Sequence, residues 1–532
     1  MLPRRPAARP DRNPLSRPDP MHTDARTLED GHVLDADLCI AGAGAAGISI
    51  AREWIGNARK VLLLEGGGFD YEPAMQELYR GENVGLPYFP LQAARLHYFG
   101  GTTGHWAGFC STYDDLDFQP RSWVPHSGWP IARAALDPYY ARAQRILELG
   151  PYEYDAAWWQ RRIPSLVPFA YDRRRLWSKM WQFSPPTRFG TRYRGEIVGA
   201  RNVHLLTHAN VCEVETNESA SAVTGLRIRT LEGKQLRARA RHYVLACSTI
   251  QNARLLLASD RHATSGLGNA HDLVGRYFME HLEMPSGTLV LTGTRPASTA
   301  MYDFEWGKTK ARAEIAASPA VQRERRMLNA TVSLIPATAG ESAKSTFEAF
   351  TPDVLEARRR AEREGRSLSD SPPANGEQAQ RVFELHTRQE QAPNPASRVT
   401  LARERDALGM PRPRLDWRLT SLDRHSFRSF YDVLGRELGR IGVGRVRMND
   451  WVASRGESWP SSLGGGWHHM GTTRMHPDPK QGVVDPNCGV HGVGNLSIAG
   501  ASVYPTAGSA NPTLTLVALS LRLSDRLKSA LR

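Results

Sequence analysis

The sequence predicts an α/β fold, α+β overall, in which a mostly parallel sheet is joined to a second part built on an antiparallel sheet. Two observations predict it. A short buried strand, a glycine-rich turn and a helix occupy residues 37–54, which is how a βαβ unit begins. Residues 285–335 and 380–450 instead alternate in the way that suits an antiparallel sheet with helices.

Length and composition limit the class of protein. The chain has 532 residues, enough for two to four folding units. With 41% hydrophobic and 23% charged residues, intrinsic disorder is excluded for most of it. No window approaches the roughly 18 consecutive apolar residues of a membrane-spanning helix. The net charge is +13, but the basic residues are 60 Arg and only 8 Lys, which indicates coding bias more than a nucleic-acid-binding patch.

The cysteines exclude several kinds of site. Cys39, Cys110, Cys212, Cys247 and Cys488 form no C-x-x-C pair and stand beside no histidine cluster. This argues against a disulfide framework, a structural zinc or an iron–sulfur cluster. We therefore predict no metal site, and reduced thiols in a cytoplasmic protein.

Two segments are predicted to lie outside the folded core. Residues 1–34 form a disordered tail, because their start is rich in Pro and Arg and has no hydrophobic periodicity. The pair Arg4-Arg5 is not followed by the apolar region of a signal peptide. Residues 340–378 are charged and nearly free of aromatics, which predicts a solvated helix and a mobile loop.

The first βαβ unit carries a dinucleotide-binding fingerprint. Its strands are residues 37–41 and 61–64, with a helix at 48–54 between them. The turn after the first strand, at 42–47, has the pattern G-x-G-x-x-G, a weak signal alone that gains weight from this context.

Each residue of the fingerprint has a physical task. Gly42 makes the tight turn, Gly44 lets the backbone approach a pyrophosphate, and Gly47 permits close packing of helix on strand. Glu65 ends the second strand, where a carboxylate accepts hydrogen bonds from a ribose diol and repels the extra phosphate of NADP. FAD and NAD are not separated by this pattern.

A second turn, at residues 99–108, favours flavin. Gly101, Thr102 and Thr103 offer backbone amides and hydroxyls, and His105 follows them. Such a turn has no role in a simple nicotinamide enzyme, but it suits a cofactor that extends past the pyrophosphate into a large ring system. We therefore predict FAD.

Two later strands complete the parallel sheet. Residues 243–246 and 496–499 have the same buried character, and helix-like stretches follow them at 252–258 and 513–527. The nucleotide-binding part is therefore discontinuous in sequence.

The C-terminal region carries the motifs that reveal a family resemblance. His468-His469-Met470-Gly471-Thr472, Ala501-Ser502-Val503-Tyr504-Pro505 and Asn511-Pro512-Thr513 follow the fingerprint and the Gly-Gly-Thr-Thr turn in order. The chain thereby resembles the glucose–methanol–choline (GMC) family of flavoprotein oxidoreductases. The His-Trp after the turn is most similar to the branch that contains pyranose oxidase and the flavin subunits of bacterial fructose, gluconate and glucoside dehydrogenases.

The resemblance implies a division into two domains. A Rossmann-like FAD-binding domain would consist of residues 35–120, 196–284 and 456–532. A discontinuous substrate-binding domain, built on the antiparallel sheet, would consist of residues 121–195 and 285–455.

The resemblance also implies a catalytic pair. Oxidising an alcohol requires a base within hydrogen-bond reach of the hydroxyl, and neutral imidazole is available near pH 7. The family pattern His-x-x-Gly-Thr selects His468 as the base, with His469 as a neighbour. Asn511 takes the second catalytic position, beside the substrate oxygen. A competing interpretation makes Asn511 only the N-cap of a helix that begins at Pro512.

Other residues are implied to contact the cofactor. In the similar branch a histidine at the place of His105 can be joined covalently to the flavin, but Gly104 departs from the usual Thr-His-Trp, so a covalent bond and a non-covalent contact both remain open. Val211 aligns with the residue whose backbone meets the adenine. Ala501 and Thr513 lie where the main chain approaches the pyrophosphate and the isoalloxazine.

We predict an enzyme that oxidises an alcohol group, on a sugar, glycoside or polyol, by proton removal at His468 and hydride transfer to flavin N5. The alternatives are a non-sugar alcohol as substrate or a flavin-containing lyase. Trp158, Trp159, Trp177 and Trp181 could form a carbohydrate-stacking wall or belong to the core.

The partners are less determined by sequence. Oxygen, a quinone or a separate redox protein could accept the electrons, and no C-x-x-C-H motif is present for a haem on this chain. No nucleic-acid recognition motif is found. A small partner subunit, a homo-oligomer and export with a partner all remain open.

Overall fold

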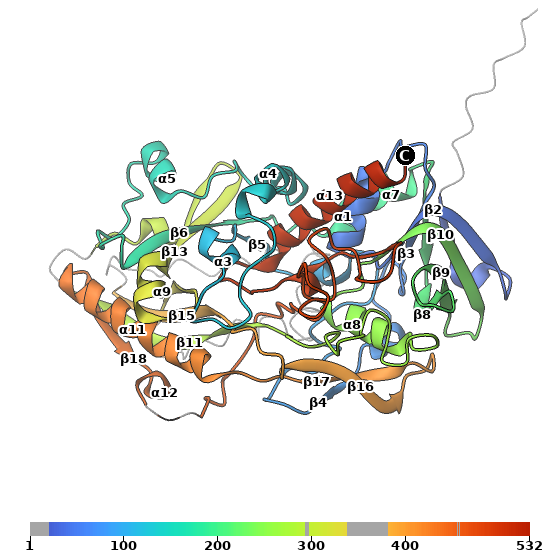
Figure 1. Cartoon of the computed structure of the whole chain (residues 1–532). Coiled ribbons are helices and arrows are strands. Elements are labelled where there is room, and N and C mark those ends of the chain that lie inside the picture. The colour runs from blue at the N-terminus through green and yellow to red at the C-terminus, as the bar shows by residue number, and fades with distance from the viewer. Residues whose placement is uncertain (1–20, 293–296, 338–380, 455, 457) are drawn as a thin grey trace, which may run out of the picture.

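The computed structural model describes residues 21–292, 297–337, 381–454, 456 and 458–532. Two eight-stranded sheets dominate it, the first on the right of Figure 1 and the second on the left. A three-stranded sheet of β16 (Arg398–Arg405), β17 (Pro411–Asp416) and β4 (Glu82–Asn83) runs along the lower edge.

The first sheet has the strand order β1-β7-β3-β2-β10-β9-β8, with β19 paired to β10. Its strands are β1 (His22–Asp24), β2 (Val33–Ala41), β3 (Val61–Leu64), β7 (Val203–Thr207), β8 (Asn210–Thr216), β9 (Val223–Arg229), β10 (Gln235–Leu245) and β19 (Leu496–Ile498). All pairings are parallel except those of β9 and β8. The four buried strands predicted from sequence all lie here, so the discontinuous α/β sheet is confirmed.

Three helices link this sheet to the site. α1 (Ala45–Glu53) joins β2 to β3, α8 (Thr249–Ala258) follows β10, and α13 (Pro512–Ala530) closes the chain. α13 packs against α1 and against α4 (Asp137–Ile146). The other α-helices of the described residues are α2 (Pro73–Glu77), α3 (Asp115–Phe118), α5 (Ala156–Arg162), α6 (Phe189–Arg192), α7 (Arg194–Val198), α9 (Pro319–Arg325), α11 (Ser421–Arg440) and α12 (Asp450–Ala453).

The second sheet is antiparallel throughout, as the sequence predicts. Its order is β18-β11-β15-β14-β13-β6-β5, with β12 on β13. Its strands are β5 (Phe109–Cys110), β6 (Leu176–Phe183), β11 (His281–Leu291), β12 (Phe304–Trp306), β13 (Thr309–Ala317), β14 (Ala330–Pro336), β15 (Val382–Glu390) and β18 (Gly444–Met448).

The two faces of the second sheet differ in chemistry because side chains alternate along a strand. One face presents Ile315, Val332 and Leu385, which share a hydrophobic core with Leu434 of α11. The neighbouring positions on β13 and β15, including Arg312 and Arg388, point to the opposite face, where the site lies.

The start of the chain corrects a prediction. Residues 21–34 are not part of a disordered tail: β1 pairs in parallel with β7 at the edge of the first sheet, and β2 already begins at Val33. A three-residue strand has no periodicity to detect, and its partner lies some 180 residues away in sequence. Residues 1–20 and the predicted mobile segment 340–378 lie outside the described residues.

Some chain segments pack with the other half than the one predicted. β17, within the predicted substrate-binding segment 285–455, pairs with β4, and Trp417 belongs to the core of the first half. α4, within 121–195, packs on α13. Conversely, β5 joins the second sheet. These segments pack through contacts between residues that are distant in sequence, and local composition does not indicate which half such a segment joins.

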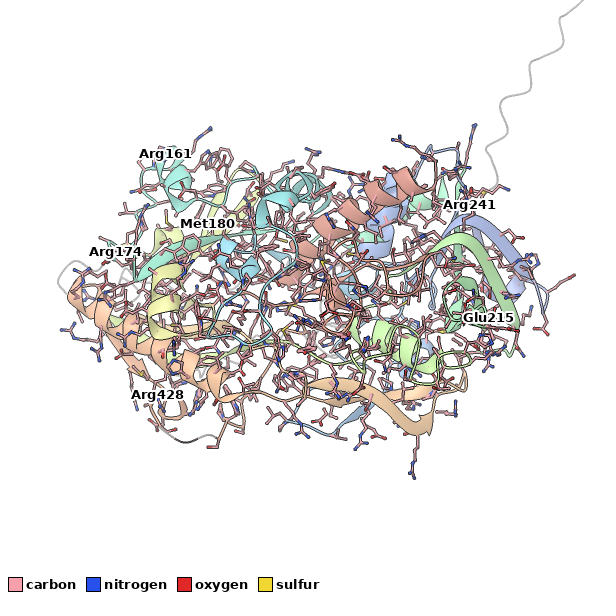
Figure 2. All side chains as sticks on the ribbon, in the orientation of Figure 1. Arg161, Arg174, Met180, Glu215, Arg241 and Arg428 are labelled. Atoms are coloured by element: carbon pink, nitrogen blue, oxygen red, sulfur yellow. The ribbon has the colours of Figure 1, made fainter. Side chains whose placement is uncertain are left out.

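No helix in the described ranges is long and apolar enough to cross a membrane. Figure 2 shows the labelled side chains of Arg161, Arg174, Arg241 and Arg428 at separate edges of the molecule, whereas Met180 is enclosed.

Candidate functional site

A cavity of about 380 Å³ lies where the first sheet, the C-terminal block and the second sheet meet. Predicted site residues that line it from the first half are Gly42, Gly44, Glu65, Gly101, Thr102, Thr103 and His105. Those that line it from the C-terminal block are His468, Ala501, Asn511 and Thr513.

Two predicted residues do not line the cavity. Gly47 lies behind the fingerprint, in α1. Val211 lies on β8, beside Asn210, whose side-chain amide donates to the Gly66 carbonyl at 3.1 Å. The structure therefore brings the other predicted site residues together around the cavity. Gly47 packs α1 against the fingerprint turn, and Val211 follows Asn210, the residue that contacts Gly66.

The fingerprint glycines differ in what a side chain would meet. Gly42 has φ of +101°, and a Cβ there would lie 2.5 Å from the Ala246 carbonyl oxygen. At Gly47 a Cβ would overlap the Gly42 carbonyl oxygen. At Gly44, by contrast, a Cβ would meet no atom within 4 Å, because it would project into the cavity. Two glycines are thus required for packing and one for open space.

Glu65 is held by the backbone of the same turn. Its two carboxylate oxygens accept hydrogen bonds from the Ala43 and Gly67 amides, each at 3.0 Å. Burial raises the pKa of the Glu65 carboxyl, although hydrogen bonds from these amides act in the opposite direction. The carboxylate is fixed at the cavity wall with lone pairs to spare for a ribose diol.

The second turn lies directly against the first. It forms the short 3-10 helix Gly101–Gly104, and a Cβ on Gly101 would lie 3.2 Å from Gly44 Cα. The Thr103 hydroxyl donates to the Gly100 carbonyl at 2.6 Å. At Gly104 a Cβ would overlap the Tyr98 hydroxyl. The departure from Thr-His-Trp therefore has a steric reason.

His105 is buried beside the cavity. Its side chain is among the lining groups and the residue is 3% exposed. Its ring centroid lies 5.1 Å from that of Trp467, with 33° between the planes. This position is compatible with contact to a planar ring in the cavity.

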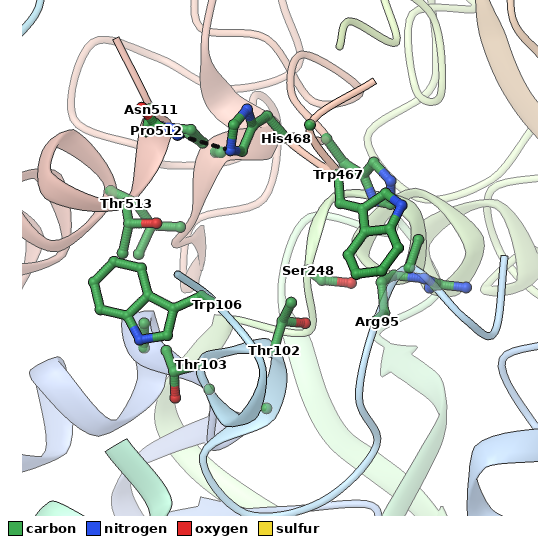
Figure 3. Close-up of a pocket in the computed structure, with 18 of the residues that line it drawn as sticks. Arg95, Thr102, Thr103, Trp106, Ser248, Trp467, His468, Asn511, Pro512 and Thr513 are labelled. Atoms are coloured by element: carbon green, nitrogen blue, oxygen red, sulfur yellow. Dashed lines mark hydrogen bonds between the residues drawn. The ribbon is translucent and has the colours of Figure 1, made fainter. Parts of the chain in front are cut away.

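His468 and Asn511 meet across the upper edge of the cavity (Figure 3). The Asn511 side-chain nitrogen lies 3.1 Å from His468 Nε2. Asn511 stands at the N-cap of α13, but its side chain makes no capping hydrogen bond. Its Oδ1 instead accepts from Trp181 Nε1 at 3.0 Å. The interpretation of Asn511 as merely a helix cap is therefore wrong for its side chain.

The other side of the His468 ring meets β11. Its Nδ1 lies 2.9 Å from His281 Nδ1 and 3.4 Å from Glu283 Oε1. A Cβ on Gly466 would overlap this ring. His281, Glu283 and His468 also have the mutual spacing of metal ligands, but the Arg388 guanidinium already pairs with Glu283.

The second sheet supplies a wall of paired charges. Arg388 donates to Glu283 at 2.6 Å and to Glu314 at 3.2 Å, and Arg312 donates to Glu314 at 2.5 Å. Burial alone would raise the pKa of the Glu314 carboxyl, but the charges of Arg388 and Arg312 lower it to about 2. Two cations face two anions, and burial lowers the pKa of the neighbouring His386 imidazole. The wall is polar without net charge.

Sequence reasoning missed this wall. Its members on the cavity are Glu283, Arg312, Ser333, His386 and Arg388. The signal that could have found them is the polar side chain at alternate positions, at Lys310, Arg312 and Glu314 on β13 and at Glu384, His386 and Arg388 on β15.

Of the two interpretations of the four tryptophans, packing in the core is the one that the structure supports. Trp159 and Trp181 are fully buried, and Trp158 packs edge to face on Trp159 at 5.0 Å between ring centroids. None of the four predicted tryptophans lines the cavity. Their density reflects packing of the second half, and the aromatic groups on the cavity are instead Tyr79, Trp106, Phe109 and Trp467.

The cavity fits FAD on observations made within this chain. Open space above Gly44 leaves room for a pyrophosphate against backbone, and Glu65 stands where a ribose would follow. At the other end, the first turn of the 19-residue helix α13 lines the cavity through Pro512 and Thr513. A helix N-terminus stabilises negative charge, which a reduced flavin carries.

Fold and site together define a flavin-dependent oxidoreductase with a Rossmann-like nucleotide-binding half. Two family models, both described as GMC oxidoreductase, match residues 194–283 and 393–520. The chain belongs to the GMC oxidoreductase family.

Similarity to individual proteins extends over nearly the whole chain. The fructose dehydrogenase large subunit of Gluconobacter japonicus is 25% identical over 94% of this chain and 99% of its own. The 6'''-hydroxyparomomycin C oxidase of Streptomyces lividus is 27% identical over 93% of this chain and 92% of its own. Among solved structures, formate oxidase of Aspergillus oryzae RIB40 has a TM-score of 0.56 at 16% identity, covering 94% of this chain and 99% of that chain, which shows the fold alone.

These findings confirm the predicted family, cofactor and class of enzyme. The protein is an FAD-dependent oxidoreductase that acts on alcohol groups.

Proposed function

We propose that the protein oxidises one hydroxyl of a neutral sugar, glycoside or polyol, with His468 as the base and Asn511 beside it. The observation that carries the proposal is the orientation of Asn511. Trp181 Nε1 can only donate, so the atom of Asn511 that faces it is the amide oxygen. The amide nitrogen therefore faces His468 Nε2, which must accept.

This orientation prepares His468 for proton removal. An Nε2 atom that accepts a hydrogen bond is unprotonated; its single lone pair faces Asn511 here, and both residues line the cavity, so an alcohol that displaces this contact would meet the same lone pair. Asn511 has a second N–H, which is available to the oxygen of an alcohol in the same place. When bound, FAD supplies the hydride acceptor at N5. His468 takes the hydroxyl proton.

The charge balance of the wall supports a neutral, hydroxylated substrate. Arg312, Arg388, Glu283 and Glu314 neutralise one another, yet their donors and acceptors remain beside Ser333 and His386. Such a surface can hydrogen-bond several hydroxyls without requiring a charged ligand. The name of one relative, a fructose dehydrogenase, agrees with this class.

The proposal is tested by anaerobic mixing of the holoenzyme with a panel of sugars, glycosides, polyols and simple alcohols, followed by flavin absorbance. Wild type is expected to be reduced by neutral polyols. His468→Ala is expected to retain flavin and lose reduction rate by about 10²- to 10⁴-fold. The exposed His262→Ala serves as the control. Reduction of His468→Ala at the wild-type rate would refute the base, and a flavin that no alcohol reduces would favour the lyase.

For His105 we propose a covalent bond to the flavin ring. Burial at the cavity wall and contact with Trp467 support it. Acid precipitation of the holoprotein decides: yellow colour should remain in the pellet and be lost in His105→Ala, whereas colour wholly in the supernatant would leave only a non-covalent contact.

Backbone contacts of Val211, Ala501 and Thr513 with FAD are proposed alongside. Ala501 and Thr513 line the cavity, which supports them, whereas Val211 has only its place beside Asn210. The electron acceptor is best sought by repeating the panel with oxygen, a quinone and an artificial dye. Turnover only with the dye would favour a separate redox protein, with a partner subunit and its export as the next question.

A further inference from the structure

We propose that His281 is a positioning residue that holds the proton of His468 on Nδ1 and so keeps Nε2 unprotonated and able to take the substrate proton. The inference rests on the proposed role of His468 and goes beyond it, because His281 lies behind that ring, on β11, and is not among the groups that line the cavity. It follows from the hydrogen-bond partners of two rings.

The partners of His281 determine which of its nitrogens bears hydrogen. Its Nε2 lies 3.1 Å from the Ala507 carbonyl oxygen and 3.0 Å from the Gly508 carbonyl oxygen. A carbonyl can only accept, so Nε2 must donate. In a neutral imidazole the other nitrogen is then an acceptor. His281 Nδ1 therefore accepts from the group it faces, which is His468 Nδ1 at 2.9 Å.

Assigning donors and acceptors to the His468 ring in the same way leaves one arrangement of its hydrogen. Its Nε2 accepts from Asn511, and its Nδ1 donates to His281. A protonated His281 would turn a second donor toward His468 and break the bond between the rings. A protonated His468 would turn a donor toward the Asn511 amide and break that bond. With both rings neutral, every contact in the series Trp181, Asn511, His468, His281 and the Ala507–Gly508 carbonyls is satisfied.

Burial agrees with a neutral His281. The residue is fully buried, and burial together with the neighbouring His468 lowers its pKa to about 3. His281 is therefore not itself a proton carrier near neutral pH. Its role is to hold Nδ1 in place as the hydrogen-bond acceptor for His468.

Glu283 complements His281 once His468 has taken up a proton. Its carboxylate lies 3.4 Å from His468 Nδ1. Burial alone would raise the pKa of the Glu283 carboxyl, but the charge of Arg388, together with the nearby His468, holds it well below its usual range. The alcohol O–H bond breaks, its proton stays on His468 Nε2, and the resulting cation faces one anion and one neutral acceptor. The titratable groups that face His468 are Glu280, His281, Glu283 and His469, and Arg388 and His386 face Glu283 in turn.

Two substitutions separate the two bonds of His281. Asn resembles the Nδ1 side of histidine, so His281→Asn keeps an acceptor for His468 and loses the donor to the carbonyls. Gln resembles the Nε2 side, so His281→Gln keeps the donor to the loop and loses the acceptor. If the role is positioning, the two variants differ in the state of His468. If His281 only supports the 507–508 loop, His281→Gln is the milder change.

The experiment is ¹⁵N NMR of the holoenzyme labelled at histidine, with the His468 signals identified by their loss in His468→Gln. We expect hydrogen on Nδ1 of His468 in wild type and in His281→Asn, and a mixture with the Nε2–H form in His281→Gln. The rate of anaerobic flavin reduction should fall about 10- to 100-fold in His281→Gln, with little change in KM and with a pH profile shifted from wild type. His262→Gln is the control.

Three results would overturn the inference: an Nε2–H form of His468 in wild type, the same form in both variants, or a smaller loss of rate in His281→Gln than in His281→Asn. If His281→Gln does not retain flavin, the wild-type spectrum and His281→Asn decide alone, since an Nε2–H form in either is sufficient to refute it. A wild-type rate in His468→Gln would instead refute the proposed base and leave the hydrogen position intact.

Discussion

The two walls of the cavity are built in different ways. The nucleotide-binding wall presents backbone: glycines that leave space, amides that hold Glu65, and the start of α13. The second-sheet wall presents buried charged side chains that are paired across strands, such as Glu283 with Arg388. One wall depends on the absence of side chains and the other on their register.

This difference predicts how each wall fails. Where backbone is close-packed, at Gly42 and behind it at Gly47, the nucleotide-binding side tolerates no added atom, because the backbone cannot move aside at low cost. A charged wall tolerates shape changes better than loss of one charge, because the remaining partner is left buried without compensation. Substitutions on the two sides should therefore be read out by different measurements.

The largest effect is expected at Gly47. In Gly47→Ala the added methyl group would overlap the Gly42 carbonyl, so folded holoprotein should not form. In Gly44→Ala the methyl group enters open space, so the chain should fold but bind FAD more weakly. Flavin content per chain and thermal unfolding measure both, with Gly195→Ala, where a Cβ meets no atom within 4 Å, as control. Normal FAD content in Gly47→Ala would break the contrast.

Next in size is Glu314→Gln in the charged wall. The substitution removes the carboxylate that pairs with both Arg312 and Arg388. We expect it to lower the free energy of unfolding at pH 7 by about 3 kcal/mol. The pKa of Glu314 in the folded protein, about 2, lies below the ordinary glutamate value of 4.5. The stabilisation is therefore complete above pH 4.5 and is lost as pH falls toward 2.

Urea unfolding of wild type and Glu314→Gln between pH 7 and pH 3 measures this effect. The difference in unfolding free energy should shrink as the pH falls. The exposed Glu305→Gln on β12 should track wild type throughout. A difference that stays constant with pH would show that shape, and not charge, matters at this position.

The contrast between the walls also explains what the sequence could predict. Gly42, Gly44 and Glu65 were predictable because their tasks depend on neighbours within one βαβ unit, where spacing reflects geometry. Glu283 and Arg388 are 105 residues apart and meet only through the register of β11 and β15. No local pattern encodes that pairing.

The same reasoning applies to the catalytic pair and its surroundings. His468 and Asn511 were predicted through family motifs, but the partners that orient them, Trp181 and His281, come from β6 and β11 of the other half. From sequence alone, Trp181 could belong to a sugar-stacking wall or to the core. Its indole nitrogen faces Asn511, and only the structure gives that direction.

A smaller effect is expected at Gly466, where the two walls meet. The methyl group of Gly466→Ala would displace the His468 ring and perturb its contact with Glu283. We expect flavin to stay bound while its reduction by substrate slows about 100-fold, because misplacement by about 1 Å costs that much. Gly435→Ala in α11, where a Cβ would make ordinary contact at 3.7 Å, is the control. Unchanged reduction would mean that the loop relaxes without moving the ring.

The smallest effect is expected from a comparison of the tryptophans around Trp159 with the charged wall of the second sheet. Trp306 is 38% exposed and packs against Trp159 at 5.8 Å between ring centroids, away from the cavity. Trp306→Ala should leave the KM for a sugar unchanged, whereas His386→Ala removes a hydrogen-bonding group from the lining and should raise KM about tenfold. A raised KM in Trp306→Ala with unchanged KM in His386→Ala would move the sugar site from the charged wall to the aromatic cluster. The two variants therefore test whether the substrate binds at the paired charged side chains of the second sheet or at the tryptophans around Trp159.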